Sequence, residues 1–152
     1  MKCSVFLATS TDGYIASEDG SIDWLDQANA NVPDGEDCGF SNFLDSVDYL
    51  IMGRKTFEQV IGFGEWPYGE INVIVMTSKP NIIPANISKT VSQSNEDVQS
   101  LYNKIKRTGA HRLYVDGGAT VNSFLKAGLI DDITLTQVPV LIGKGISLFT
   151  EG

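Results

Sequence analysis

The sequence is poor in the side chains that most often hold metal ions or act as nucleophiles. It contains two cysteines, Cys3 and Cys38, and one histidine, His111, among 152 residues. Neither a disulfide framework nor a zinc site of cysteine and histidine can be assembled from so few, and we expect no metal ion. A catalytic triad that depends on an imidazole is also not expected.

Basic residues and long apolar runs are scarce as well. Lys and Arg number 11 against 19 Asp and Glu, which gives a formal net charge of -8. Because a nucleic-acid surface requires positive charge, this balance argues against nucleic acid as a partner. No apolar run approaches the roughly 18 residues of a membrane span, and no signal peptide is evident, so we expect a cytoplasmic protein without membrane contact. The length predicts one domain over residues 1–152.

Alternating apolar patterns predict strands separated by helices. The predicted strands are Cys3–Thr9, Val47–Met52, Ile71–Met76, Arg112–Val115 and Ile133–Leu141, and the predicted helices cover 40–47, 57–61, 98–105 and 118–128. Ser94 and Asp97 resemble a capping box before the third of these helices. The alternation favours a three-layer α/β sandwich with a mostly parallel central sheet, in which ligands bind at the carboxyl ends of the strands.

One strand end has the composition of a phosphate site. Residues 52–58 place a glycine (Gly53), two cations (Arg54 and Lys55) and a hydroxyl (Thr56) where a buried strand gives way to a helix. The unpaired N–H groups of a first helical turn and the helix dipole hold anionic oxygens, and a guanidinium suits a phosphate monoester. The alternative is a surface helix that begins with basic residues and binds nothing.

Two further strand ends carry the same kind of chemistry. Residues 115–120 run from a strand into a helix through two adjacent glycines, Gly117 and Gly118, which let a ligand approach the backbone. Thr77 and Ser78 end a third strand with two hydroxyls that suit a ribose phosphate. Each pattern is also common in ordinary turns. On neighbouring strands, however, the two helix junctions could be bridged by one extended pyrophosphate.

Five segments occur in the order and spacing of the dihydrofolate reductase-like superfamily. They are residues 8–16, 52–58, 73–78, 116–118 and 131–136. Over nearly the whole chain the sequence therefore resembles this superfamily. It is most similar to the RibD C-terminal type, the pyrimidine reductase domain of riboflavin biosynthesis, because Asp116 precedes the glycine pair where true dihydrofolate reductases have a third glycine.

The resemblance implies NADPH binding and hydride transfer to a small heterocycle of the pyrimidine or pteridine kind, as in 5-amino-6-(5-phosphoribosylamino)uracil reductase. Arg54 would lie near the adenosine 2'-phosphate, which favours NADPH over NADH. The protein would mainly align donor and acceptor and exclude water. The implied cofactor-binding residues are Ala8, Ile15, Gly53, Arg54, Lys55, Thr56, Thr77, Ser78, Gly117, Gly118, Ala119 and Thr120.

Reduction of a C=N bond also needs a proton. By the same resemblance, Asp37 falls at the position of the substrate carboxylate of dihydrofolate reductase, and Thr136 falls at the hydroxyl that pairs with the same ring. A carboxylate in an apolar cleft could bind an aminopyrimidine edge and promote its protonation. Asp37 could instead cap a helix, and a short gap would bring Asp34 or Glu36 into its register.

Two departures from the family bear on the substrate. The arginine that grips the folate carboxylate falls at Glu70, a charge reversal that would repel a folate tail. No basic cluster lies between Phe63 and Glu70 to hold a ribosyl phosphate. Trp24, Trp66 and Phe63 could border a substrate pocket, although aromatic residues beside loops more often serve packing.

Several functions therefore stay open from the sequence. The expected one is an NADPH-dependent reductase, and the alternatives are a diverged dihydrofolate reductase, a non-catalytic NADP-binding module, or a purely architectural role for the junctions. The family continues with a final antiparallel strand pair that this sequence does not include. Either the chain is shortened, or a homodimer partner covers the exposed sheet edge.

Overall fold

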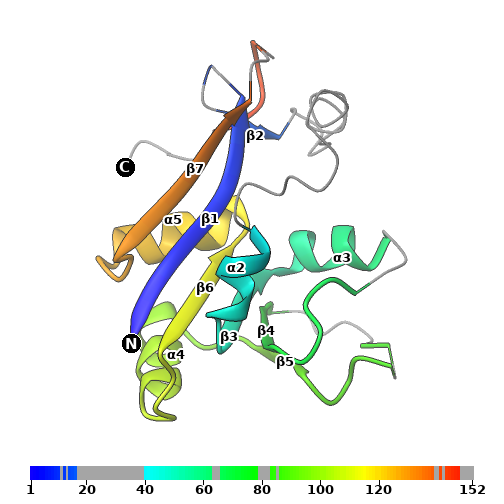
Figure 1. The fold of residues 1–152 in the computed structure, drawn as a ribbon, viewed down its shortest axis with the longest axis vertical. Helices are drawn as coiled ribbons and strands as arrows, with labels where there is room; N and C mark the ends of the chain where they lie inside the picture. The colour runs from blue at the N-terminus through cyan, green and yellow to red at the C-terminus, as the bar shows by residue number, and fades with distance from the viewer. Residues whose placement is uncertain are drawn as a thin grey trace.

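The computed structural model describes residues 1–10, 12, 14–16, 40–62, 66–78, 83–84, 86–138, 141 and 143–147. The elements in chain order are β1 (Lys2–Ser10), β2 (Tyr14–Ala16), α2 (Phe40–Asp45), β3 (Tyr49–Gly53), α3 (Arg54–Gly62), β4 (Asn72–Met76), β5 (Val91–Ser94), α4 (Val98–Lys106), β6 (Arg112–Asp116), α5 (Gly118–Lys126), β7 (Asp132–Val138) and β8 (Ile146–Ser147) (Figure 1). In this part of the chain, no helix has the length and apolar character needed to cross a membrane.

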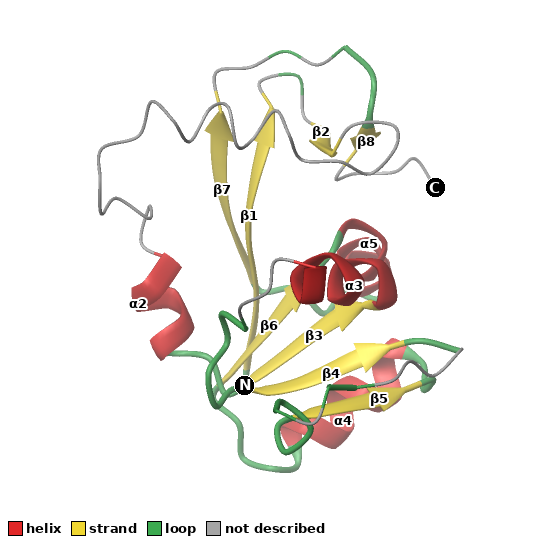
Figure 2. Cartoon of the chain, turned by 90° about the vertical axis from the view of Figure 1, so that its right-hand side faces the viewer, coloured by secondary structure: helices red, strands yellow, loops and turns green. Residues whose placement is uncertain are grey.

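A six-stranded sheet organises the chain, with strand order β5-β4-β3-β6-β1-β7. Every neighbouring pair in this sheet is parallel. Parallel neighbours require crossover connections, and helices supply several of them, which explains the alternation seen in the sequence. The predicted α/β class with a mostly parallel sheet is confirmed. Outside the sheet, β2 and β8 form a separate antiparallel pair (Figure 2).

Side-chain alternation along the strands builds a hydrophobic core on each face of the sheet. In β3, Met52 joins the cluster that contains Phe57 of α3, whereas Ile51 joins the opposite cluster with Phe124 of α5. Consecutive residues of a strand point to opposite faces, so a continuous apolar run is covered on both. Helices α2 and α3 therefore lie on one face and α4 and α5 on the other, as the predicted three layers require.

An aromatic cluster fixes α2 over the sheet. The Phe43 ring stacks on Phe6 of β1, with centroids 5.0 Å apart, and meets Tyr114 of β6 edge-on at 4.9 Å. Such pairs add about 0.5–1.5 kcal/mol to the burial of the rings themselves. After the helix, the Asp48 carboxylate accepts a hydrogen bond from the His111 backbone N–H at 2.6 Å. These contacts hold α2 over β1 and β6.

The structure corrects two local predictions. The last long strand ends at Val138, and Leu141 lies outside any strand. The N-cap of α4 is Asp97, whose carboxylate accepts from the Ser100 N–H at 2.9 Å. The predicted capping box at Ser94 is therefore wrong, because Ser94 is the last residue of β5, a strand too short to be recognised in the sequence.

Candidate functional site

Three strand ends meet at one edge of the sheet. Strands β6, β3 and β4 are consecutive neighbours, and their register pairs Met52 with Asp116 and Gly53 with Met76. Gly117 and Thr77 therefore follow strands that flank the one ending at Gly53. The expectation that the two glycine junctions lie on neighbouring strands is confirmed, and the carboxyl ends of parallel strands are where such sheets bind ligands.

The two junctions approach each other so closely that side chains are excluded. A Cβ on Gly117 would lie 2.6 Å from Thr56 Oγ1, and one on Gly53 would lie 3.0 Å from Thr120 Oγ1. Gly117 also has a φ of 92°, a conformation that other residues rarely adopt. Glycine is required at 117 for both reasons. The first turns of α3 and α5 are consequently packed together at the same sheet edge (Figure 2).

Both helix starts carry the features of an anion site. No side chain caps the amino end of α5, where Gly117 is the N-cap residue, so its first N–H groups are not used by a cap. At the start of α3, Arg54 and Lys55 are both exposed. Two helix dipoles and two cations would act on a negative group placed there. The predicted residues Ala119 and Thr120 occupy the first turn of α5, with Thr120 buried.

Arg54 already has an ionic partner. Its Nε lies 2.9 Å from Glu58 Oε1, one turn along the helix, and the two side chains are 44% and 52% exposed. An exposed pair of this kind contributes only about 0.3–0.5 kcal/mol. A phosphate dianion can therefore compete for the guanidinium through two parallel hydrogen bonds. Arg54 is available to a ligand, with Glu58 as a weak competitor.

The other predicted cofactor residues are distributed over the ends of β4 and β1. Thr77 follows β4 and donates its backbone N–H to the Ser94 carbonyl at 2.9 Å. Ser78, the next residue, is exposed. Ala8 of β1 pairs in register with Thr136 of β7. These backbone positions are compatible with their predicted roles, which the structure does not test. Asp37, like Trp24 and Phe63, lies outside the described residues.

Ile15 lies on β2, which is tied to the segment after β7. Strand β2 pairs with β8, and the Asp12 carboxylate links the same two segments by accepting from the Gly143 N–H at 2.8 Å. The Ser10 hydroxyl donates to Asp12 at 2.6 Å. The chain that leaves the end of β1, where the resemblance places the nicotinamide, is thus fastened to the segment carrying β8.

An acid that the sequence reasoning left without a role stands directly beside the glycine pair. Asp116 ends β6, and its carboxylate accepts from the Gly117 N–H at 2.9 Å. Burial raises its pKa to about 6, and the hydrogen bond offsets part of this effect. Burial and the charge of Asp116 together raise the pKa values of Tyr68 and Tyr114. An acidic residue between a buried strand and a glycine pair is the signal that could have identified this group.

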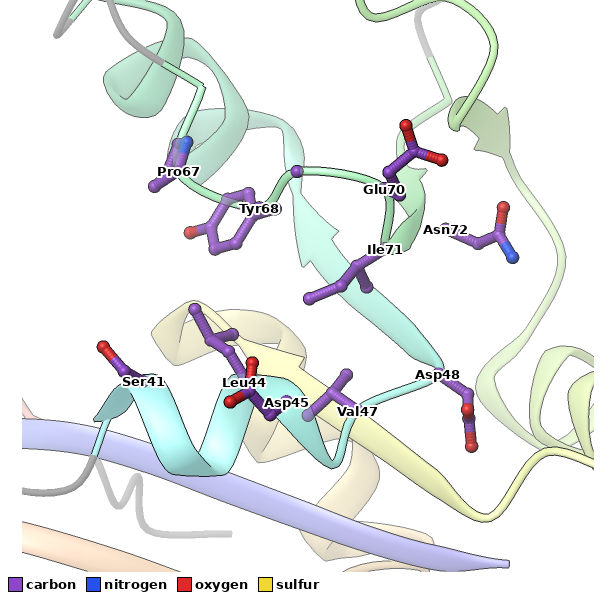
Figure 3. A pocket seen from close by; sticks show the side chains of 11 residues that line it. Ser41, Leu44, Asp45, Val47, Asp48, Pro67, Tyr68, Glu70, Ile71 and Asn72 are labelled. Atoms are coloured by element: carbon purple, nitrogen blue, oxygen red, sulfur yellow. The ribbon is translucent and has the colours of Figure 1, made fainter.

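A cavity of about 630 Å³ lies on the face of the sheet that α2 and α3 cover, between α2 and the segment that enters β4 (Figure 3). It is lined by Ser41, Leu44, Asp45, Val47, Asp48, Pro67, Tyr68, Gly69, Glu70, Ile71 and Asn72. Trp66 packs beside this wall, with its ring 5.1 Å from that of Tyr68 and 6.1 Å from that of Phe57. These ring contacts support a packing role for Trp66.

The fold places the chain among α/β proteins with a parallel sheet. More specifically, it belongs to the RibD C-terminal domain family, whose model matches residues 2–152. Relatives in Bacillus subtilis (strain 168) are the uncharacterized protein YwjB, 37% identical over 99% of this chain and 83% of that protein, and the uncharacterized protein YyaP, 29% identical over 95% and 78%. The family resemblance inferred from the five sequence segments is confirmed.

Solved structures agree with this assignment. A crystal structure described as a proposed riboflavin biosynthesis protein from Shewanella sp. PV-4 is 37% identical, with a TM-score of 0.90 over 99% of this chain and 84% of that one. A diaminohydroxyphosphoribosylaminopyrimidine deaminase/5-amino-6-(5-phosphoribosylamino)uracil reductase from Thermotoga maritima is 18% identical, with a TM-score of 0.66 over 97% of this chain and 47% of that one. The second likeness concerns the fold alone.

Replacing Gly117 by alanine tests the close junction. We expect Gly117→Ala to lower the free energy of unfolding by about 2–4 kcal/mol, because it combines a positive φ with a clash against Thr56. Gly128→Ala is the matched control, since Gly128 has a φ of 71° but nothing within 4 Å of an added Cβ. Urea unfolding of both variants measures the difference. An equal decrease in the free energy of unfolding for Gly117→Ala and Gly128→Ala would show that the two junctions are not in contact.

The raised pKa of Asp116 predicts a pH dependence of stability. Its pKa of about 6 in the folded chain exceeds the value of about 3.9 expected when unfolded, so the folded state binds more protons between these values. The contribution of Asp116 to stability is therefore greatest below about pH 4 and falls by about 1–2 kcal/mol as the pH rises to about 6. Urea unfolding of the wild type and Asp116→Asn across this range measures it. Parallel curves for the two proteins would contradict the raised pKa.

Proposed function

We propose that the chain is an NADPH-dependent reductase that transfers hydride to a pyrimidine- or pteridine-like heterocycle. The observation that carries the proposal is the contact between two side-chain-free helix junctions, at Gly53 and Gly117, on neighbouring parallel strands. This contact brings the uncapped first turn of α5 beside the exposed Arg54 and Lys55 at the start of α3, so the residues present fit a pyrophosphate bound at the two helix starts. Membership of the RibD C-terminal domain family supports the same cofactor.

The arrangement suggests a direction for the bound cofactor. With its pyrophosphate at the first turn of α5, the adenosine end would extend toward α3 and β4. There Arg54 and Lys55 supply the cations, and Thr77 and Ser78 supply hydroxyls beyond the next strand end. A 2'-phosphate would meet Arg54 on this path, so we propose selection of NADPH over NADH. When bound, the cofactor supplies hydride, and the protein orients it and excludes water.

The acceptor class and the proton source are further parts of the proposal. The Thermotoga maritima protein of similar fold is described as a uracil reductase, which supports a planar, nitrogen-rich acceptor for this chain. Asp37 and Thr136 remain the residues proposed to bind that ring. Asp116 is a second candidate acid, because a carboxyl with a pKa of about 6 changes protonation near neutral pH.

Removing the Arg54 guanidinium tests the cofactor proposal. We expect Arg54→Ala to weaken NADPH binding by about 1.5–3 kcal/mol, because a bidentate contact to the 2'-phosphate is lost. NADH binding should change little, since NADH lacks that phosphate. Titration followed by nicotinamide fluorescence measures both dissociation constants.

Two matched variants complete this test. Glu58→Gln releases Arg54 from its partner at 2.9 Å and should leave NADPH binding unchanged or up to about twofold tighter. Lys106→Ala removes one positive charge from the last turn of α4, on the other face of the sheet, and should have no effect. Equal weakening of NADPH and NADH by Arg54→Ala would contradict a 2'-phosphate contact. Absence of NADPH binding to the folded wild type would overturn the cofactor proposal.

A further inference from the structure

The six-stranded sheet opens between β1 and β6 part of the way along both strands. The register of β1 with β6 covers Lys2, Cys3 and Ser4, whereas β1 continues to Ser10 beside β7. Strand β6 likewise continues to Asp116 beside β3. Figure 2 shows β1 and β7 leading away from β6 beyond the paired residues. Such a fork removes the next backbone hydrogen bonds of the ladder, so the freed groups on both strands need other partners.

The register of the ladder identifies the groups that the fork frees. Lys2 donates its backbone N–H to the His111 carbonyl at 2.9 Å, so Lys2 and every second residue after it direct their peptide groups toward β6. After Ser4, the last paired residue, the next one in this series is Phe6. If the ladder continued in the same register, the Phe6 carbonyl would accept a hydrogen bond from the Gly117 N–H.

Two side chains of β6 bind these two backbone groups instead. The Tyr114 hydroxyl donates to the Phe6 carbonyl at 3.1 Å. The Asp116 carboxylate accepts from the Gly117 N–H at 2.9 Å. Tyr114 and Asp116 alternate with Val115 along β6, so they share one face of the sheet. Side-chain hydrogen bonds therefore end the ladder, and each strand has a partner for its freed group where the strands separate.

Packing holds the Tyr114 hydroxyl in this position. The side chain is 3% exposed, and its ring meets the Phe43 ring of α2 edge-on at 4.9 Å. The Phe43 ring in turn stacks on that of Phe6, with centroids 5.0 Å apart. Burial raises the pKa of Tyr114 well above its ordinary value, so the hydroxyl keeps its proton and stays a donor. Tyr114 thus connects β6 to β1 beyond their last paired residues.

The fork lies between the two ends of the proposed cofactor site. Gly117 and the first turn of α5, which would hold the pyrophosphate, directly follow β6. Ala8, which the family resemblance places beside the nicotinamide, lies on β1 beyond Phe6. A dinucleotide bound at both positions would span the fork. The placement of its nicotinamide half would therefore depend on where β1 is held relative to β6, whereas the placement of its adenosine half would not.

We propose that Tyr114 is a positioning residue for the cofactor, and that it aligns the nicotinamide half with the pyrophosphate by holding β1 against β6. Tyr114 acts through the Phe6 carbonyl and the course of β1, and not by contact with the reacting atoms. The inference rests on the reductase function proposed above. It makes the hydrogen bond between Tyr114 and Phe6 necessary for one half of the dinucleotide and dispensable for the other.

Comparing NADPH with 2'-phospho-ADP-ribose, which is the same molecule without its nicotinamide, tests this role. Tyr114→Phe keeps the ring against Phe43 and removes the hydroxyl that bonds to Phe6. We expect NADPH to bind this variant about 3- to 10-fold more weakly than the wild type, because the nicotinamide half loses its alignment. Binding of 2'-phospho-ADP-ribose, which needs only the β6 side of the fork, should change less than about twofold. Isothermal titration calorimetry measures each dissociation constant.

Two further variants are matched controls. Ser4→Ala removes a buried hydroxyl from the residue that pairs with Tyr114, and this hydroxyl makes no hydrogen bond within the described part of the chain. Tyr102→Phe removes a phenol hydroxyl from α4, which packs in the opposite core cluster. Both variants keep the bond to Phe6, so each should bind both ligands within about twofold of the wild type. Circular dichroism checks that every variant is folded.

The outcomes distinguish this inference from the proposed function. Equal weakening of both ligands by Tyr114→Phe, or no change in either, overturns the positioning role. A selective loss of NADPH binding in Ser4→Ala as large as that in Tyr114→Phe overturns it as well, because the hydroxyl of Tyr114 would then not be the cause. In each of these cases, NADPH binding by the wild type leaves the reductase proposal standing. Failure of the folded wild type to bind NADPH overturns the cofactor proposal and this inference together.

Discussion

The contact between the ends of β3 and β6 is the constraint on which the proposed site depends. Gly117 can approach Thr56 only because it has no side chain, and its positive φ turns the chain from the strand into α5. A larger residue would push the two helix starts apart, and a single pyrophosphate would no longer span them. The parallel sheet makes this contact possible, because neighbouring parallel strands present their carboxyl ends at the same edge.

The carboxyl edge of the sheet has a charge opposite to that of the chain as a whole. On the side of the helix starts, N–H groups, Arg54 and Lys55 create a local positive region in a chain of net charge -8. Asp116 is buried at the end of β6, directly beside this region. A dinucleotide would therefore be held there by its phosphates.

Much of the fold could be predicted because the pattern and the packing agree. The run around Leu50, Ile51 and Met52 indicated a strand covered on both faces, and the structure covers it with helices on each side. Short elements such as β5 carried too little pattern to be recognised, and Asp97 rather than Ser94 caps α4 because Ser94 is used by that strand. The junctions were predictable from composition, but their contact and the raised pKa of Asp116 depend on tertiary neighbours.

The central claim is that the two glycine junctions form one cofactor site, and backbone amide chemical shifts during an NADPH titration test it most directly. We expect the largest shifts to occur together at residues 53–56 and 117–120, with one dissociation constant for both segments. Shifts confined to one junction, or concentrated elsewhere in the chain, would contradict a shared pyrophosphate site.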